Sequence, residues 1–163
     1  MPIVHSELCI AHLFTMLTIH PKTLRALQAH GEAAYPNEGA GLLLGNAADG
    51  HKSVVDILSL ENHWEAEEQY HRYLITPQDM LRAETEALRR GLDVLGIFHS
   101  HPDHPAEPSG MDRDWALPWY SYIITTVAQG RATVSRSWLL REDRSAFDEE
   151  KIEISGLENS PIL

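Results

Sequence analysis

A short tract near the middle of the chain limits the fold and the chemistry more than any other feature. The mainly apolar run 92–98 is followed directly by His99, Ser100, His101 and Pro102. The run predicts a buried strand, and because strand side chains alternate between faces, His99 and His101 leave its end on the same face. Pro102 has no amide hydrogen for a sheet ladder and ends the strand. The sequence therefore predicts two imidazoles that converge on one point.

A third metal ligand follows the two histidines. The loop that contains Pro105 and Pro108 can return the chain so that Asp112 joins His99 and His101. Two histidines and one carboxylate leave one tetrahedral position of a zinc ion open, which is how catalytic zinc differs from structural zinc. We therefore predict one Zn²⁺ per chain, held by His99, His101 and Asp112. Zinc lowers the pKa of its water ligand from about 15.7 toward 7 and so supplies a nucleophile at neutral pH.

The same residues also have a purely structural interpretation. Ser109 and Asp112 have the S-x-x-D spacing of a helix capping box, in which the serine accepts a backbone N–H and the acid reaches back. Taken alone, this spacing favours a helix cap, and the two histidines alone can be polar residues at a strand end. The complete set, with its fixed spacing, favours the metal site. Ser109 can cap the helix as well.

The metal motif resembles the signature of the JAMM (MPN+) metalloproteases, a glutamate upstream of H-S/T-H-P-x6-S-x-x-D. Here the upstream glutamate is Glu38, which stands just before the glycine-rich apolar segment 39–45. The resemblance extends from about residue 17 to about residue 154. It implies an α/β (α+β) fold, the MPN domain, in which helices flank a curved mixed β-sheet similar to that of the cytidine deaminases. It also implies that Glu38 is the general base and that Ser109 stabilises the oxyanion.

The resemblance implies a zinc metallopeptidase of the deubiquitinase-like isopeptidase type. The expected substrate is a ubiquitin-like or sulfur-carrier protein, cleaved after its C-terminal Gly-Gly, with its tail added as a strand at a sheet edge beside the metal. Two alternatives stay open, a noncatalytic MPN interaction module and a general zinc peptidase. Noncatalytic members have typically lost the metal ligands, whereas this chain keeps the complete motif, so the sequence favours an enzyme.

Composition is consistent with one enzyme domain and argues against several partners. The chain has 163 residues and a formal net charge of −11, from 13 basic and 24 acidic residues. Nucleic acid and anionic membranes are therefore not expected partners. The single cysteine, Cys9, allows neither an internal disulfide nor the Cys-ligated zinc of the nucleoside deaminases. Without an apolar run long enough for a membrane or the features of a signal peptide, we expect a cytoplasmic protein; its oligomeric state stays open.

The remaining sequence predicts one domain, residues 16–163, preceded by a poorly ordered extension, residues 1–15. Helices are predicted from Pro21 to before Pro36 and from Thr76 to Gly91. The second of these helices is expected to bury Met80, Leu81, Ala87 and Leu88. Besides the histidine strand, strands are predicted at residues 41–45, 53–60, 122–128, 132–140 and 147–154.

Three groups of residues near the motif are not assigned to the metal site. Trp115 and Trp119 are predicted to pack in the core behind the metal loop, and Asp103 and His104 are expected to be exposed loop residues. The segment 61–72 contains enough ligand-type side chains to suggest a second metal site. Because no third ligand is fixed there, we favour an exposed acidic loop that makes at most modest partner contacts. The side chains concerned are those of His63, Glu65, Glu67, Glu68 and His71.

Overall fold

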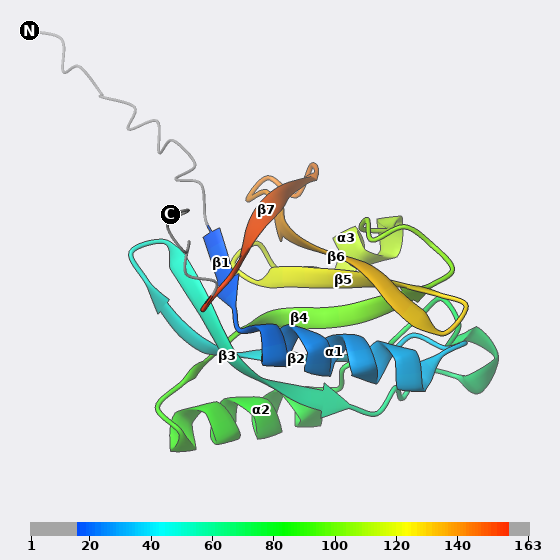
Figure 1. Ribbon diagram of the computed structural model, residues 1–163, viewed down its shortest axis with the longest axis horizontal. Coiled ribbons are helices and arrows are strands. Elements are labelled where there is room, and N and C mark those ends of the chain that lie inside the picture. The colour runs from blue at the N-terminus through cyan, green and yellow to red at the C-terminus, as the bar shows by residue number, and fades with distance from the viewer. Residues whose placement is uncertain (1–15, 157–163) are drawn as a thin grey trace, which may run out of the picture.

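The computed structural model describes residues 16–156, whose strands form one closed sheet flanked by helices (Figure 1). The predicted extension at residues 1–15, with Cys9, lies outside the described residues. The strands are β1 (Met16–Ile19), β2 (Ala40–Ala48), β3 (His51–Leu60), β4 (Asp93–Pro102), β5 (Ser121–Ala128), β6 (Arg131–Leu140) and β7 (Phe147–Ile154). The helices are α1 (Pro21–Ala34), α2 (Pro77–Arg89) and α3 (Gly110–Trp115), with a short 3₁₀ turn, η1, at Ala66–Glu68.

The sheet is mixed and curves until it closes. Its strand order is β1-β3-β2-β4-β5-β6-β7, and β7 pairs with β1 to complete the ring. The pairs β1–β3, β1–β7 and β4–β5 are parallel, and the other pairs are antiparallel. This arrangement confirms the predicted curved mixed sheet with flanking helices. The histidine strand β4 pairs with β2 as far as His99 and with β5 as far as Pro102, so it has a neighbour on both sides up to His99.

Both faces of β2 are buried, which explains its nearly continuous run of leucines. Leu43 packs in a cluster with Leu27 of α1, whereas Leu42 and Leu44 pack in a second cluster with Ala83 of α2. A strand covered on both faces loses the polar–apolar alternation of a half-exposed strand. This packing fixes β2, and with it the chain segment that precedes Ala40.

The two long helices begin where the sequence predicts. Pro21 occupies the first turn of α1, and Thr76 caps α2 in a capping box with Asp79. The predicted buried side of α2 is partly wrong, because Leu81 is 65% exposed and Leu88 is 81% exposed. The prediction is correct for Ala87, and the helix also buries Ala83; the small side chains of both allow its backbone to lie close to the sheet. Among residues 16–156, no helix is long and apolar enough to cross a membrane.

Candidate metal centre

His99 and His101 lie at the end of β4 and point to the same side, as the alternation of strand side chains requires. Their Nε2 atoms are 3.1 Å apart. Both side chains are buried among neighbouring elements, and Phe98 before them is part of the main core cluster. The end of β4 therefore directs the Nε2 atoms of both histidines toward one point.

Asp112 comes from α3 and faces both imidazoles. Its Oδ1 lies 3.2 Å from His99 Nε2, and its Oδ2 lies 3.7 Å from His101 Nε2. Burial alone would raise the pKa of Asp112, but the nearby His99 and His101 and the N–H of Ser109 outweigh it, so that the pKa lies well below its usual range. The carboxylate is therefore ionised and available as a ligand.

The three donor atoms fit a tetrahedral zinc ion. Zinc bonds of about 2.0–2.2 Å place neighbouring ligand atoms about 3.3–3.6 Å apart in a tetrahedron. His99 Nε2 lies 3.1 Å from His101 Nε2 and 3.2 Å from Asp112 Oδ1, and both separations are close to this range. The distance of 3.7 Å from His101 Nε2 is to the other carboxylate oxygen, Oδ2. Within residues 16–156, His99, His101 and Asp112 form the single group of three or more His, Cys, Asp or Glu side chains that converge in this way.

The two rings are oriented by different contacts. His101 Nδ1 lies 2.7 Å from the carbonyl oxygen of Pro105, and because a carbonyl only accepts, Nδ1 carries the hydrogen. In the neutral ring this leaves the Nε2 lone pair directed at the centre. His99 Nδ1 is buried without a hydrogen-bond partner in the described part of the chain. Its ring is held instead by Tyr73, whose ring centre lies 4.6 Å away at an interplanar angle of 30°.

Glu38 is the buried carboxylate beside this centre. It lies between α1 and β2 and is only 6% exposed. Burial raises the pKa of Glu38 to about 7, an effect that Asp112 strengthens and that His99 and His101 oppose. These influences place Glu38 within electrostatic reach of all three candidate ligands. A carboxylate with a pKa near neutrality can both accept and release a proton at physiological pH.

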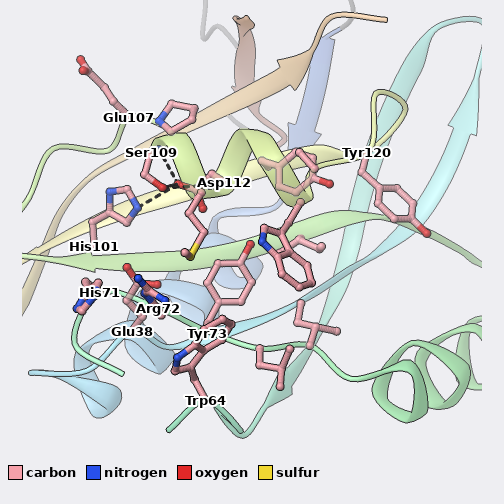
Figure 2. A pocket seen from close by; sticks show the side chains of 18 of the residues that line it. Glu38, Trp64, His71, Arg72, Tyr73, His101, Glu107, Ser109, Asp112 and Tyr120 are labelled. Carbon is pink, nitrogen blue, oxygen red and sulfur yellow. Dashed lines mark hydrogen bonds and ion pairs between the residues drawn. The ribbon is translucent and has the colours of Figure 1, made fainter. Parts of the chain in front are cut away.

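The candidate residues open into a cleft of about 570 Å³ (Figure 2). Glu38, His101, Ser109 and Asp112 all line it, with Tyr73 and Tyr120 among the aromatic residues of its walls. Most of the remaining lining is apolar, and it comes from the segment before α2, from α2 itself and from the chain around α3. The cleft therefore combines a mainly apolar lining with the polar candidate residues.

Ser109 caps α3 and contacts Asp112 in both directions. Its hydroxyl donates to Asp112 Oδ2 over 2.7 Å and accepts the Asp112 N–H over 3.1 Å, while its own N–H donates to Oδ2 over 2.6 Å. The capping box proposed from the spacing is thus present together with the convergence on the histidines. To donate to a substrate oxygen, the hydroxyl hydrogen of Ser109 must turn away from Asp112.

The prediction that Trp115 and Trp119 pack in the core is wrong. Trp115 is 69% exposed and lines the cleft. Trp119 is 53% exposed, and its ring lies over Lys52 Nζ, 4.5 Å from the ring centre. Trp115 ends the short helix α3, none of whose six residues is buried, and Trp119 follows that helix. The core beside α3 is formed instead by Ala116, Tyr122 and Leu140.

The exposed positions predicted for Asp103 and His104 are confirmed. Asp103 fixes the loop after β4, because it accepts hydrogen bonds from Tyr35 Oη and from the N–H of Gln129. His104 also lines the cleft.

The segment 61–72 is more ordered than the predicted acidic loop. Glu68 accepts a hydrogen bond from Trp64 Nε1 and pairs with Arg72, while His63 lies 3.9 Å from Asp79. Glu68 and His63 therefore have other partners, and the side chains considered for a second metal site do not converge in the described structure. No sequence pattern predicted the contact of Tyr73 with His99, because it joins residues from distant parts of the chain.

Comparisons with known proteins agree with this geometry. The model of the family described as prokaryotic homologs of the JAB domain matches residues 20–141. A desampylase from Pyrococcus furiosus is 36% identical over 76 residues, which cover 47% of this chain and 51% of that protein. A probable TtuB-protein conjugate cleaving protease from Thermus thermophilus is 33% identical over 99 residues, covering 59% and 62%. The matches thus span only about half to three fifths of these two relatives.

Two solved structures resemble the fold over most of the chain. The solution structure of a protein from Desulfitobacterium hafniense has a TM-score of 0.75 and 32% identity, covering 85% of this chain and 92% of that one. A solution structure from Salinibacter ruber has a TM-score of 0.68 and 37% identity, covering 89% and 95%. The family match covers α1, β2, the histidine strand and α3, which carry or border every candidate residue. The chain therefore belongs to the family of prokaryotic homologs of the JAB domain, as its JAMM-like motif predicted.

Proposed function

We propose that this protein is a zinc-dependent peptidase or isopeptidase of the cytoplasm that cleaves after the C-terminal Gly-Gly of a ubiquitin-like or sulfur-carrier protein. The observation that carries the proposal is the convergence of His99, His101 and Asp112 beside a buried Glu38 whose pKa is raised to about 7. The names of two relatives, a desampylase and a TtuB-protein conjugate cleaving protease, support a protein-conjugate substrate.

In the proposed reaction, His99, His101 and Asp112 hold one zinc ion. When bound, zinc supplies a Lewis acid that makes water nucleophilic near neutral pH and polarises a carbonyl group. The Glu38 carboxylate takes a proton from the attacking water and passes it to the nitrogen of the leaving amine. The Ser109 hydroxyl, once turned from Asp112, donates to the oxygen on which negative charge develops.

The cleft supports an extended tail as the part of the substrate that enters. Its apolar walls enclose the polar groups, so the backbone of a tail can approach Glu38 and Ser109 while water is displaced. Glycine is the residue that allows the closest approach of a backbone to other groups, because it has no Cβ. We therefore expect Gly-Gly at the cleavage site and strong exclusion of a bulky side chain there.

A sulfur-carrier protein fused to a short C-terminal extension tests the proposal. Mass spectrometry should find cleavage immediately after Gly-Gly by the zinc-loaded protein, and a Gly→Leu change at the last glycine should block it. Glu38→Gln should reduce turnover by about 10²–10⁴-fold while zinc is retained, because only the proton acceptor is removed. Glu61→Gln, at an exposed glutamate outside the cleft, is the matched control. Equal cleavage of the leucine variant, or cleavage of unfolded peptides only, would point instead to a general peptidase.

A further inference from the structure

The backbone of Glu38 is held from both sides by a segment that carries none of the candidate ligands. The Glu38 N–H donates to the carbonyl oxygen of Gln69 over 2.7 Å, and the Glu38 carbonyl accepts from Asn62 Nδ2 over 3.1 Å. Glu38 itself lies outside both α1 and β2. The position of its carboxylate therefore depends on these contacts and on the neighbouring Gly39, whose N–H donates to Ser100 Oγ over 2.9 Å.

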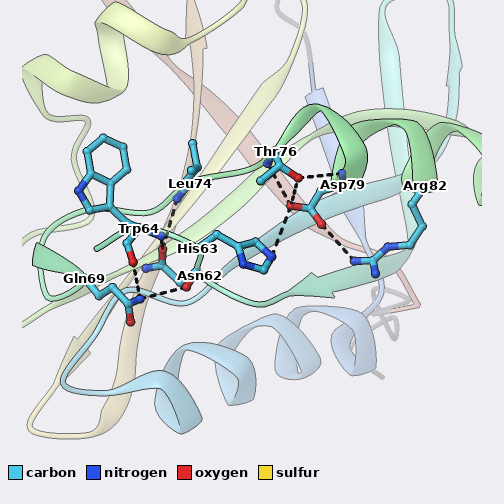
Figure 3. A network of polar contacts seen from close by, with 8 residues as sticks. All are labelled: Asn62, His63, Trp64, Gln69, Leu74, Thr76, Asp79 and Arg82. Carbon is cyan, nitrogen blue, oxygen red and sulfur yellow. Dashed lines mark hydrogen bonds and ion pairs between the residues drawn. The ribbon is translucent and has the colours of Figure 1, made fainter. Parts of the chain in front are cut away.

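Asn62 uses the full hydrogen-bonding capacity of its side-chain amide. Its Nδ2 donates to the carbonyl oxygens of Glu38 and Arg72, the latter over 2.8 Å. Its Oδ1 accepts the N–H groups of Trp64 and Leu74 over 3.0 and 3.3 Å, two contacts that can be followed in Figure 3. An amide has two donor hydrogens and two acceptor lone pairs, and all four are engaged with backbone groups. No other natural side chain of the same shape offers this combination.

The contacts of Asn62 also connect Glu38, the proposed base, to Tyr73, whose ring packs on His99. Arg72, whose carbonyl Asn62 holds, directly precedes Tyr73, and the Tyr73 ring lies against His99. The Gln69 side chain closes the same turn, because its Nε2 donates to the carbonyl oxygens of Asn62 and Trp64 over 3.0 and 2.7 Å (Figure 3). One amide therefore links the backbone of Glu38 to the chain that holds His99 in place.

We propose that Asn62 is a positioning residue that sets the Glu38 carboxylate relative to His99 and the metal. The inference rests on the proposed function, in which Glu38 is the proton acceptor. A general base must lie within hydrogen-bond reach of the proton it takes, and a displacement of about 1 Å can reduce the rate on the order of a hundredfold. Asn62 itself does not line the cleft and touches no candidate ligand, so its effect on the reaction is indirect, through the backbone groups that it holds.

Asn62→Asp tests this assignment because aspartate has the same shape but only accepts hydrogen bonds. The variant keeps acceptors for the Trp64 and Leu74 N–H groups and loses both donors to the Glu38 and Arg72 carbonyls. The Glu38 N–H keeps its own acceptor, the Gln69 carbonyl, so its exchange reports whether the segment loosens when the contact at the Glu38 carbonyl is lost. In the zinc-loaded full chain, this exchange should become at least about tenfold faster, while Trp64 and Leu74 stay protected. The zinc content should stay at the wild-type level. With a cleavable conjugate, kcat should fall by roughly tenfold to a hundredfold and KM should change little.

Asn46→Asp is the matched control, since Asn46 is exposed on β2 and should leave exchange at Glu38 and kcat unchanged. Unchanged protection of Glu38 in Asn62→Asp, or faster exchange with an unchanged kcat, would overturn the assignment. Loss of zinc together with faster exchange throughout the chain would also overturn it, because Asn62 would then stabilise the fold in general. If Asn62→Asp does not fold, Asn62→Ser, which cannot span both carbonyls, replaces it under the same criteria. If the wild type cleaves no conjugate, the proposed function fails, and the exchange data still decide whether Asn62 holds Glu38.

Discussion

Asp112 reaches His99 Nε2 with one carboxylate oxygen, 3.2 Å away, while its other oxygen accepts the hydrogen bonds that cap its own helix. The two interpretations of the S-x-x-D spacing, a helix cap and a metal ligand, therefore apply to one side chain at once. The cap has a consequence for the site, because it fixes the rotamer that directs Oδ1 toward the histidine. The first turn of α3 and the candidate metal centre should thus respond together to substitution.

Ser109→Ala tests whether Ser109 contributes to catalysis in addition to capping α3. Loss of the N-cap should destabilise the fold by about 1 kcal/mol. Turnover should fall by roughly 10²–10³-fold if Ser109 also stabilises an oxyanion. Thr76→Ala removes the same kind of capping box from α2. It should lower the free energy of unfolding by a similar amount, with little change in turnover. Urea denaturation and steady-state kinetics measure the two effects, and an equal loss of turnover in both variants would contradict the role of Ser109.

Metal binding should depend on His101 and not on its neighbour in the same loop. We expect about one zinc per wild-type chain by elemental analysis, and a loss of that zinc in His101→Ala. His104→Ala should bind zinc like the wild type, because His104 is exposed and lies outside the converging group. Free zinc at 100 times its dissociation constant should stabilise the wild type by about 2.7 kcal/mol in thermal unfolding. Equal zinc content in both variants would exclude His101 as a ligand.

Glu38 should make the metal-free protein less stable as the pH rises. Its pKa in the folded chain is about 7, against 4.5 for an ordinary glutamate, so below pH 4.5 the carboxyl is protonated in both states. Between these values the unfolded chain ionises first, and by pH 8 the burial of this carboxylate costs about 3 kcal/mol. Metal-free Glu38→Gln should therefore be more stable than the wild type at pH 8 and similar to it at pH 4. Urea denaturation at both pH values checks this, with Glu61→Gln as control; the same difference at both would refute it.

Bound zinc should reduce the stability advantage of Glu38→Gln at pH 8. A nearby cation favours the ionised carboxylate and so lowers the pKa of Glu38. The buried carboxylate therefore destabilises the protein mainly when the metal is absent. This behaviour is expected of a group that is kept for catalysis at the expense of stability.

Trp115 should contribute to substrate binding more than to folding. It is 69% exposed and lines the cleft, so Trp115→Ala should change the free energy of unfolding by less than about 1 kcal/mol. The KM for a conjugate should rise several-fold because apolar contact with the tail is lost. Leu88→Ala truncates another exposed apolar side chain, on α2 and outside the cleft, and should leave KM unchanged. A large loss of stability in Trp115→Ala would restore the core-packing interpretation.

Local rules predicted those parts of the molecule that local geometry determines. The alternation of strand side chains brought His99 and His101 together, and the capping residues Pro21 and Thr76 placed the starts of two helices. The buried side of α2 was predicted to be Met80, Leu81, Ala87 and Leu88, which was wrong for the two leucines. Its buried face uses Ala83 and Ala87, because close packing on the sheet requires small side chains there. Leu81 and Leu88 consequently point outward.

Rules of local geometry did not predict the contacts between segments that are distant in the sequence. Asn62 gave no signal in the sequence, because an asparagine after a strand is common and its four partners are backbone groups from three places in the chain. The exposure of Trp115 and Trp119 was missed for a related reason. Aromatic residues usually indicate a core, but none of the six residues of α3 is buried, and the core beside this helix is formed by Ala116, Tyr122 and Leu140.

The closed sheet sets a practical limit on where the chain can be shortened. The family match covers residues 20–141, so a fragment cut at those limits would lack both β1 and β7. β3 and β6 would then each present an unpaired edge, and the core would lose Leu17 and Ile19. Exposed edges of this kind recruit other chains into intermolecular sheets. Such a fragment should therefore aggregate when it is produced, although it contains every residue of the candidate metal centre.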